Sequence, residues 1–542
     1  MLNVSLDKVR YILSKDPLVP LEKGEREVII FSRDYICTIP SALEVFLRSI
    51  DWFNPLQVNI AKIYIKKWEK IEPQDAISLL DSRYPSTFVR EYAVSILSET
   101  SDDILNSYML QLCQCLMYEL YHLSPLADLI IEKCLKSPKI IGNAFFWNAR
   151  VCMKNKVFLE RLSVITTYIF MLSGPNFIKR MYTSSLLDKE LKQIALEVKE
   201  KYNSNVQHKK EEAKILLRSK VIKLDKKRFE MPIHPMYYVE HFNSEKCSIF
   251  GSKMVPILLS CISKDGGDSS FNLIYKCGKF NLIVGDDLRQ DVLTLQILRI
   301  MDKMWLDSGL DLKITAYNAL PTGIKEGFIE FVDANVIDFL QQQEGVSGAL
   351  DRELLIKHLR SVNQTNELGT KLYDSNQQFD NFIRSLAGFC VATCVLGIGD
   401  RHPGNVMIKN NGIFFHIDYG HILGNFKYKF GIKRERAPFL LTPDMAHVYI
   451  KNQKEEEFKN LCVKAYIILR KNANRLINLY IIMSSAGLPE LRGIQDVQYI
   501  KKMLMLDKNE EDAGTYFKGL INQSKNEKFR LLDNIIHNMK HG

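Results

Sequence analysis

Apolar residues recur at helical spacing through most of the first two hundred positions of this chain. The clearest case follows Pro85, where apolar residues fall at the i, i+3, i+4, i+7 and i+8 intervals of one buried helix face: Val89, Tyr92, Ala93, Ile96 and Leu97. A second run, from Leu105 to Leu116 behind the capping candidate Ser101, predicts another helix. Predicted helices begin near residues 86, 103, 125, 140 and 157, so a helix pair repeats about every 40 residues. This pattern predicts a HEAT-like helical solenoid over residues 14–205, after a short N-terminal segment, 1–13.

The pattern changes twice after residue 200. Residues 206–230 are charged and poor in aromatic residues, so we expect a linker there. Beyond it, four apolar segments bounded by Gly, Asp or Pro predict β-strands, at 248–262, 270–278, 311–321 and 327–333, and residues 286–309 predict one long helix. Mainly helical sequence follows. The expected fold is multidomain, an α-helical solenoid followed by a bilobal α+β domain with lobes at 231–335 and 336–542.

Composition narrows the class of protein. The 542 residues are too many for one hydrophobic core, and the formal net charge of +10 suits an anionic partner such as a membrane surface or a phosphorylated substrate. No apolar run reaches the roughly 18 residues that a membrane span needs, so we expect any membrane contact to be peripheral. Eleven cysteines without paired metal spacings indicate a reducing, cytoplasmic compartment.

The candidate chemistry is concentrated at residues 397–421, which read GIGDRHPGNVMIKNNGIFFHIDYGH. Asn405 precedes one short strand, and Asp418 follows the next. A turn at residues 411–412 between these strands would bring the Asn amide oxygen and the Asp carboxylate together. Hard oxygen ligands of this kind suit Mg²⁺ bound to ATP phosphates. The spacing therefore predicts a magnesium site at the open end of a hairpin.

Two histidines border this pair. His402, beside Asp400, is a candidate to accept a proton from an attacking hydroxyl, because an imidazole titrates near neutral pH. His421 is a candidate to steady a transferring phosphoryl group. The text GDRHxxN followed by HIDYGH resembles the catalytic and magnesium loops of the phosphoinositide 3-kinase superfamily. The resemblance extends to residues 34–52 and 486–517, and covers about residues 14–540.

The resemblance implies an ATP- and Mg²⁺-dependent lipid kinase with a helical accessory domain. It makes Asp400, His402 and Asn405 the catalytic loop and Asp418 the second magnesium ligand. It also implies positions that contact the nucleotide, from the phosphate end to the base: Ser252, Lys253, Asp291, Tyr317, Glu330, Val332, Met407 and Ile417.

The position of the phosphate-binding lysine is harder to assign from the sequence. The family expects it three residues before the Asp pair of GDDLRQD, where this chain has Ile283, which cannot pair with a phosphate. IYKCG, at residues 274–278, resembles the family's lysine-bearing strand, so an insertion of Lys279–Gly285 would leave Lys276 as the phosphate lysine. Ile274 and Lys276 share a face of a strand, which favours this interpretation over a slipped strand. An error in the gene model could also account for the extra residues Lys279–Gly285.

The segment after the magnesium loop should face the acceptor. It carries a cationic row: Lys427, Lys429, Lys433, Arg434 and Arg436. Such groups suit the phosphate monoesters of a phosphoinositide. KFGIKRERAPF is similar to the activation loop of class I enzymes, which phosphorylate phosphatidylinositol 4,5-bisphosphate at the 3-position. FKYK replaces the unbroken lysine run of that class, so phosphatidylinositol 4-phosphate is an alternative substrate.

The partners implied are phosphoinositide lipids at the cytoplasmic face of a membrane, with no nucleic acid. The helical module is a surface on which protein partners could bind, and no adaptor-binding or Ras-binding region is recognisable. Asn534 stands where the family's last helix usually has Trp, so we expect weaker interfacial anchoring. Two other readings stay open: a catalytically inactive scaffold that binds partners through its solenoid, and a protein kinase of the related giant family, which the basic loop disfavours.

Overall fold

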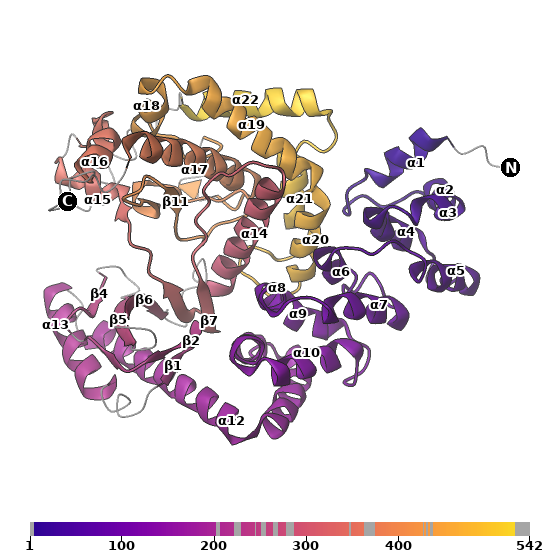
Figure 1. Ribbon diagram of the computed structural model, residues 1–542, viewed down its shortest axis with the longest axis horizontal. Helices are drawn as coiled ribbons and strands as arrows, with labels where there is room; N and C mark the ends of the chain where they lie inside the picture. Colours follow the sequence, from indigo (N-terminus) through magenta and orange to yellow (C-terminus); the bar gives the residue numbers. More distant parts are fainter. Residues whose placement is uncertain are drawn as a thin grey trace. The chain divides into compact units, whose positions relative to one another are not determined.

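The structure is a computed structural model that describes residues 5–201, 206–221, 229–243, 245–250, 256–263, 269–277, 287–345, 348–362, 374–426, 428–429, 432–433 and 437–525. The chain forms two compact units. The first comprises residues 1–282, 319–330 and 474–488, and the second comprises residues 283–318, 331–473 and 489–542. Figure 1 labels many of the elements of both units.

The first unit begins with a series of helices. They are α1 (Leu6–Leu13), α2 (Lys23–Phe31), α3 (Arg33–Ile36), α4 (Leu43–Ser49), α5 (Pro55–Ile65), α6 (Pro73–Ser78), α7 (Thr87–Ser98), α8 (Asp102–Ser107), α9 (Met109–Cys115), α10 (Pro125–Lys136), α11 (Asn143–Cys152), α12 (Lys156–Lys201) and α13 (Val206–Leu216). Side chains that accept backbone N–H groups begin α5 at Asn54 and α10 at Ser124, and each is followed by Pro. The predicted helical N-terminal region is confirmed.

The run predicted as one helix behind Ser101 is instead two helices. α8 ends at Ser107, and Tyr108 has φ −106° and ψ 9° before α9 begins. The N–H of Tyr108 bonds three residues back, to the carbonyl of Leu105 at 3.1 Å, which tightens and ends the first helix. Ser101 makes no side-chain cap hydrogen bond. Apolar residues keep their helical spacing across this break, so the sequence pattern does not predict it.

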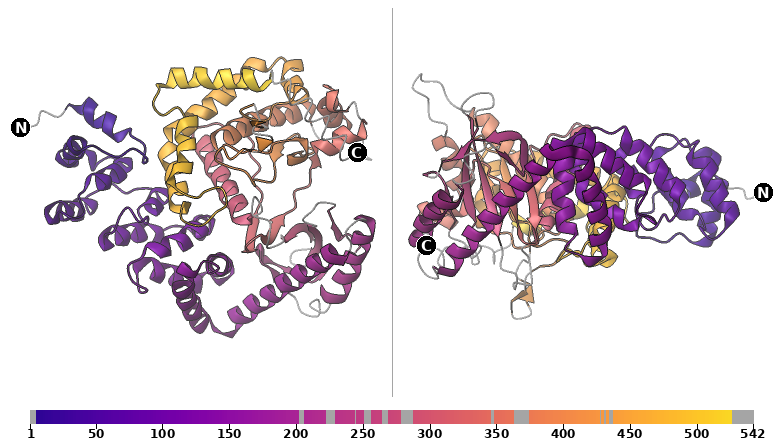
Figure 2. Two further views of the ribbon diagram at one scale, coloured as in Figure 1. Left: turned by 180° about the vertical axis from the view of Figure 1, so that it is seen from behind. Right: turned by 90° about the horizontal axis from the view of Figure 1, so that it is seen from below.

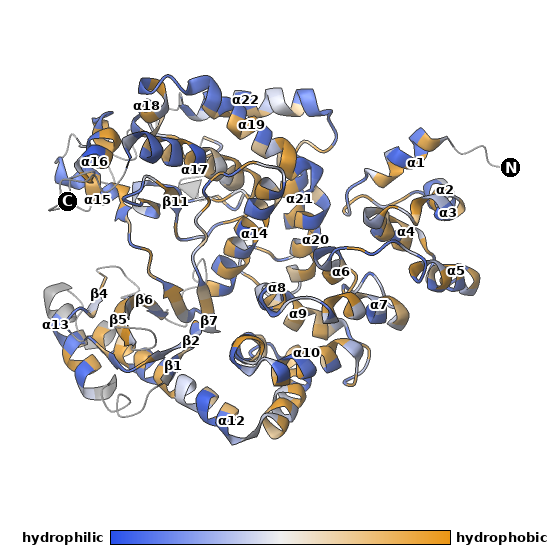
Figure 3. Cartoon of the chain, in the orientation of Figure 1, coloured by the Kyte–Doolittle hydropathy of each residue, from blue (hydrophilic) through white to orange (hydrophobic). Residues whose placement is uncertain are grey.

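The long helix α12 requires a correction to the prediction about membrane spans. By length and composition alone, Lys156–Val198 is apolar enough to cross a bilayer. Gly174, with φ 75°, and Pro175 interrupt the helix, and the bend is visible in Figure 2. Residues on both sides of the bend are buried, among them Phe158 and Leu191, whereas other apolar residues of α12, such as Leu159 and Met171, are exposed. Figure 3 shows hydrophobic and hydrophilic residues interspersed along this helix.

An antiparallel sheet completes the first unit, with strand order β3 (His241–Phe242), β5 (Ile257–Ser263), β6 (Ser269–Cys277), β8 (Glu326–Glu330) and β7 (Ala319–Gly323). A further strand, β4 (Ser248–Ile249), pairs with β5, and β1 (Phe229–Met231) pairs with β2 (His234–Val239). Leu273 and Tyr275 of β6 share a hydrophobic core with Leu187 and Leu191 of α12. The sheet therefore uses the second half of α12 as its cover.

The strand predicted at residues 270–278 is confirmed, but the one at 311–321 is wrong over most of its length. The strand there is β7, which begins at Ala319. Asp311 accepts a hydrogen bond from the backbone N–H of Lys313 at 3.0 Å, and Lys313 has φ 51°. This Asx-type turn bends the chain away from an extended conformation, and the apolar composition of the segment does not reveal it.

The second unit contains α14 (Leu288–Asp307), α15 (Ile337–Gln343), α16 (Leu354–Val362), α17 (Ser375–Val395), α18 (Pro443–Lys451), α19 (Glu455–Lys471), α21 (Ile494–Met503) and α22 (Glu510–Lys525). The predicted long helix is confirmed as α14, which Asp287 caps by accepting from the N–H of Arg289 at 3.0 Å. A three-stranded sheet has the order β11 (Phe414–His416), β10 (Val406–Ile408) and β9 (Asn335–Val336).

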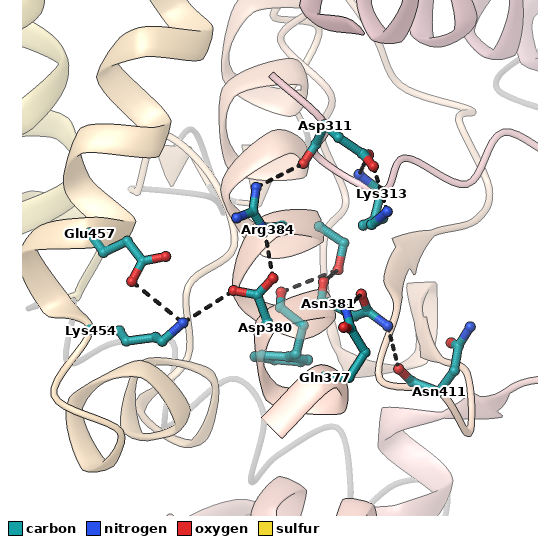
Figure 4. Close-up of polar contacts among 11 residues, drawn as sticks. Asp311, Lys313, Gln377, Asp380, Asn381, Arg384, Asn411, Lys454 and Glu457 are labelled. Atoms are coloured by element: carbon teal, nitrogen blue, oxygen red, sulfur yellow. Dashed lines mark hydrogen bonds and ion pairs between the residues drawn. The ribbon is translucent and has the colours of Figure 1, made fainter. Parts of the chain in front are cut away.

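Polar side chains of α17 hold the turn between β10 and β11. Gln378 donates to the carbonyl of Asn410 at 2.7 Å, and Asn381 donates to the carbonyl of Asn411 at 2.9 Å. Figure 4 shows Asn381 beside Asn411, and shows the adjacent residue Asp380 between Arg384 and Lys454. The hairpin therefore rests on a buried helix at its closed end, and its open end carries the candidate site.

Candidate active site

The catalytic-loop candidates lie on one tight turn between α17 and β10. Asp400 has φ 55°, a conformation that side-chain-bearing residues adopt at a cost. The backbone N–H of Asn405 donates to the carbonyl of His402 at 2.9 Å, and the Asn405 side-chain amide donates to the carbonyl of Asp400 at 2.9 Å. The amide is thereby oriented, and its oxygen is the group left to meet a ligand.

The predicted hairpin is confirmed. Val406 pairs with His416 and Ile408 with Phe414 in antiparallel register, so the two strands lie side by side and run in opposite directions. Beyond them, the N–H of Ile417 donates to the carbonyl of Asn405 at 3.0 Å. Asn405 and Asp418 therefore lie at the same open end of the hairpin. Asp418 is exposed and, like Asp400, has a positive φ, 60°.

Arg401 fastens the two loops together. Its Nε donates to the carbonyl of Gly399 at 2.8 Å, its Nη1 donates to the carbonyl of Ile417 at 2.8 Å, and its Nη2 donates to the carbonyl of Asp418. The residue is 7% exposed, so these backbone acceptors stabilise a buried guanidinium. Arg401 belongs to the GDRH motif at residues 399–402, but the spacing of the motif does not show which backbone carbonyls its side chain contacts.

The start of α14 also contacts the loop that follows β11. Asp291 accepts from the N–H of Tyr419 at 3.0 Å, and Gln290 donates to the carbonyl of Tyr419 at 3.0 Å. The ring of Tyr317 stacks on that of Tyr419 with centroids 6.4 Å apart, and burial raises the pKa of both phenols. Asp291 and Tyr317, predicted as nucleotide contacts, thus support the backbone beside Asp418.

The two histidines have different hydrogen-bond partners. Nδ1 of His402 accepts from the N–H of Gly404 at 3.2 Å. Nδ1 of His421 lies 2.6 Å from Oε1 of Glu490, a carboxylate that can only accept. In neutral rings, the proton is therefore on Nε2 of His402 and on Nδ1 of His421. Glu490 was missed from the sequence, because it lies 69 positions from its partner.

The donor set fits magnesium. Asn405 and Asp418 offer an amide oxygen and a carboxylate, the hard ligands that Mg²⁺ takes together with phosphate oxygens and water. Among the described residues, no group of three or more His, Cys, Asp or Glu side chains could hold a metal ion. An all-protein site for zinc or calcium is therefore not found in these ranges, whereas a two-ligand site shared with a nucleotide needs no such cluster.

Lys276 lies on β6, opposite Gly327 of β8. Leu273, Tyr275 and Cys277 are buried, whereas Ile274 and Lys276 are partly exposed, so the prediction that these two share a face is confirmed. Gly327 has no side chain to crowd the lysine. Ser252 and Lys253, and the suggested insertion with Ile283, lie outside the described residues.

The residues predicted to contact the base lie at the end of β8, just after it, and in or next to the β10–β11 hairpin. Glu330 ends β8 in the first unit, and Val332 follows it in the second. Met407 of β10 pairs with Phe415 and with Val336 of β9. Met407 and Ile417 are partly exposed although their strand neighbours Val406 and His416 are buried.

The basic segment is described in part. Strands β12 (Tyr428–Lys429) and β13 (Ile432–Lys433) pair with Lys429 opposite Ile432. Lys427, Arg434 and Arg436 lie outside the described residues, as does Asn534. The role of this row in substrate binding stays a prediction.

Comparison with protein families matches both parts of the chain. Residues 2–177 match the model "Phosphoinositide 3-kinase family, accessory domain (PIK domain)". Residues 279–493 match the model "Phosphatidylinositol 3- and 4-kinase", a range that includes both site loops and Glu490.

Curated relatives align along nearly the whole chain. Phosphatidylinositol 3-kinases 2 and 3 of Dictyostelium discoideum are 35% and 36% identical over 98% and 99% of this chain. The phosphatidylinositol 4-phosphate 3-kinase C2 domain-containing subunit alpha of Pongo abelii is 32% identical over 98%. The chain spans 28%, 31% and 31% of the lengths of these three proteins.

Proposed function

This chain carries the accessory domain of the phosphoinositide 3-kinase family and a phosphatidylinositol 3- and 4-kinase domain, and from that premise we propose that it transfers phosphate from ATP to the 3-hydroxyl of phosphoinositides. The observation that carries the proposal is the hairpin that places Asn405 and Asp418 at one end. The family likeness supports kinase chemistry, and the names of the relatives support the 3-position.

The residues of the site have separable roles in this proposal. MgATP, when bound, supplies the transferable phosphoryl group and the cation that neutralises its charge. Asn405 and Asp418 would hold the metal, and Arg401 keeps their loops together. Lys276 would pair with phosphate oxygens. Nε2 of His421 would accept the proton of the lipid hydroxyl, and Nε2–H of His402 would donate to the developing charge, which exchanges the roles that the sequence suggested.

The preferred acceptor in this proposal carries a phosphate on its inositol ring, either phosphatidylinositol 4-phosphate or the 4,5-bisphosphate. Two points support it: the cationic row from Lys427 to Arg436, and a relative whose name specifies phosphatidylinositol 4-phosphate. Reaction at a lipid surface would place the protein at the cytoplasmic face of membranes, held peripherally.

The test is transfer of labelled phosphate from ATP to vesicles that contain phosphatidylinositol, its 4-phosphate or its 4,5-bisphosphate. Wild type should label the phosphorylated lipids most. Asp418→Asn should lower kcat by about a hundredfold or more, because it removes charge that organises the transferring group. Lys276→Met should raise the KM for ATP and lower kcat.

The matched control is Asp507→Asn, an exposed acid of the second unit that should leave activity unchanged. Transfer that survives Lys276→Met would reject Lys276 as the phosphate lysine. Folded wild-type protein that labels no lipid would reject the kinase proposal and favour the scaffold, whose thermal stability should then not respond to MgATP.

A further inference from the structure

The imidazole of His421 is held by a buried carboxylate. Oε1 of Glu490 lies 2.6 Å from Nδ1 of His421, and Oε2 of Glu490 accepts from the backbone N–H of Ile422 at 2.8 Å. Both oxygens therefore serve the same two-residue segment, one through the side chain and one through the backbone. Glu490 is 5% exposed, so water competes little for these bonds.

The backbone at Glu490 is itself anchored. The side-chain amide of Asn425 donates to the carbonyl of Glu490 at 3.1 Å and to the carbonyl of Ile422 at 3.0 Å. The neighbouring Leu491 is fully buried. Glu490 thus has little freedom to move relative to the loop that carries His421.

That loop is also tied to the segment before the catalytic loop. The N–H of Gly399 donates to the carbonyl of His421 at 3.0 Å, and the N–H of Leu423 donates to the carbonyl of Leu396 at 2.7 Å. These two backbone hydrogen bonds hold the loop without involving the side chain of Glu490.

We propose that Glu490 is a positioning residue that fixes His421 as the Nδ1–H tautomer and so leaves the Nε2 lone pair for the acceptor hydroxyl. A carboxylate accepts and cannot donate, so the bond at Nδ1 determines which nitrogen carries the proton. The same logic assigns the opposite tautomer to His402, whose Nδ1 accepts from Gly404. The two histidines are thereby set as an acceptor and a donor.

In the reaction, this inference rests on the proposed lipid kinase function. The lipid oxygen forms a bond to the γ-phosphorus while the bond from that phosphorus to the oxygen bridging to ADP breaks. The hydroxyl proton passes to Nε2 of His421, and the Glu490 carboxylate stabilises the resulting imidazolium. The proton then returns to solvent. Glu490 contacts no reacting atom in this scheme and acts through the ring.

The experiment is Glu490→Gln, with the tautomer of His421 read from long-range ¹H–¹⁵N correlations in histidine-labelled full-length protein and assigned with His421→Gln. The glutamine oxygen can still accept from Ile422, but its NH₂ group donates to Nδ1, so the ring should change to Nε2–H. We expect kcat to fall by about a hundredfold or more while the KM for ATP is unchanged, since a base in the wrong tautomer cannot accept the proton.

Two further variants separate positioning from folding. Glu490→Asp keeps a carboxylate, so it should keep the Nδ1–H tautomer and more activity than Glu490→Gln. Asp496→Asn disturbs the same segment, where Asp496 accepts from the N–H of Arg492 at 2.7 Å, but should change neither the tautomer nor kcat.

The outcomes are distinguishable from failure of the proposed function. A wild-type His421 in the Nε2–H form would overturn the inference whether or not the protein phosphorylates lipid. A Glu490→Gln variant that changes tautomer and keeps wild-type kcat would overturn it as well. A wild type in the Nδ1–H form without lipid kinase activity would leave the tautomer assignment standing and reject the reaction in which it acts.

Discussion

Single residues decide how the site loops meet. Arg401 donates to carbonyls on both sides of the site, from Gly399 to Asp418, and does so from a buried position. Removing it would leave several buried carbonyls without a donor, which costs more than the loss of one exposed ion pair. Arg401 is therefore required for the geometry of the site, although it is not among the residues predicted to contact substrate.

A second residue-scale case is Asp302 on α14. Burial, and to a smaller extent the nearby Asp311 carboxylate, raise its pKa to about 6, and Lys313 acts in the opposite direction. Its Oδ1 is buried without a hydrogen-bond partner among the described residues. The contacts of Asp311 and Lys313 are drawn in Figure 4. The folded chain thus favours the protonated acid.

We predict that Asp302→Asn stabilises the protein at neutral pH. The folded-state pKa lies above the unfolded value of about 4, so the wild type loses stability as pH rises through that interval, and the amide does not. Because the side chain is partly exposed, the gain should be limited to about 1 kcal/mol. Urea denaturation at pH 4.5 and 7.5 measures it; an equal difference between wild type and variant at both pH values would contradict the assignment.

Among the elements, the β10–β11 hairpin is the part of the site that its own sequence predicts best. Asn411 and Gly412 mark the turn; burial alternates along β10 before it, and all three residues of β11 after it are buried. The support from α17 could not be predicted, because Gln378 and Asn381 are ordinary polar residues of a helix until the fold places a turn beside them. Periodicity finds elements; it does not find what a polar side chain on a buried face contacts.

Gly412 provides the test at this scale. It has φ 89°, and a Cβ there would lie 2.1 Å from the carbonyl oxygen of Gln378. Gly412→Ala should lower the free energy of unfolding by about 2–4 kcal/mol through backbone strain and overpacking. Gly519→Ala, where a Cβ would meet nothing within 4 Å on helix α22, should raise it by about 0.5–1 kcal/mol. Chemical denaturation of both variants measures the contrast, and equal effects would refute the explanation.

At the scale of the whole molecule, a late segment of the chain packs against α4 and α6 of the helical region. Residues 474–488, which include most of α20 (Ala473–Met483), belong to the first unit. Arg475 donates to both carboxylate oxygens of Asp75 at 3.0 and 3.1 Å, and Asn478 donates to Glu44 at 2.7 Å. Partners four hundred positions apart leave no local signal, so no periodicity or motif could indicate them.

The larger organisation was more predictable than such contacts. A helical N-terminal region and a mixed helix and sheet domain follow from the change in apolar spacing near residue 230, and the family comparisons agree with that division of character. The boundaries set at residues 205, 230 and 335 stay predictions. The location of Lys276 on a half-exposed strand face followed from period-two spacing, whereas the pairing of His421 with Glu490 needed the fold.

The position of the new phosphate tests the central claim most directly, since the catalytic family model covers both 3- and 4-kinases. Wild-type protein would be given phosphatidylinositol 4-phosphate or the 4,5-bisphosphate as substrate. The labelled products would then be deacylated and compared with standards by ion-exchange chromatography. Our account predicts label at the 3-position of both products, and label reduced by about a hundredfold or more after Asp418→Asn. Label at the 4- or 5-position, or no product from folded protein, would contradict it.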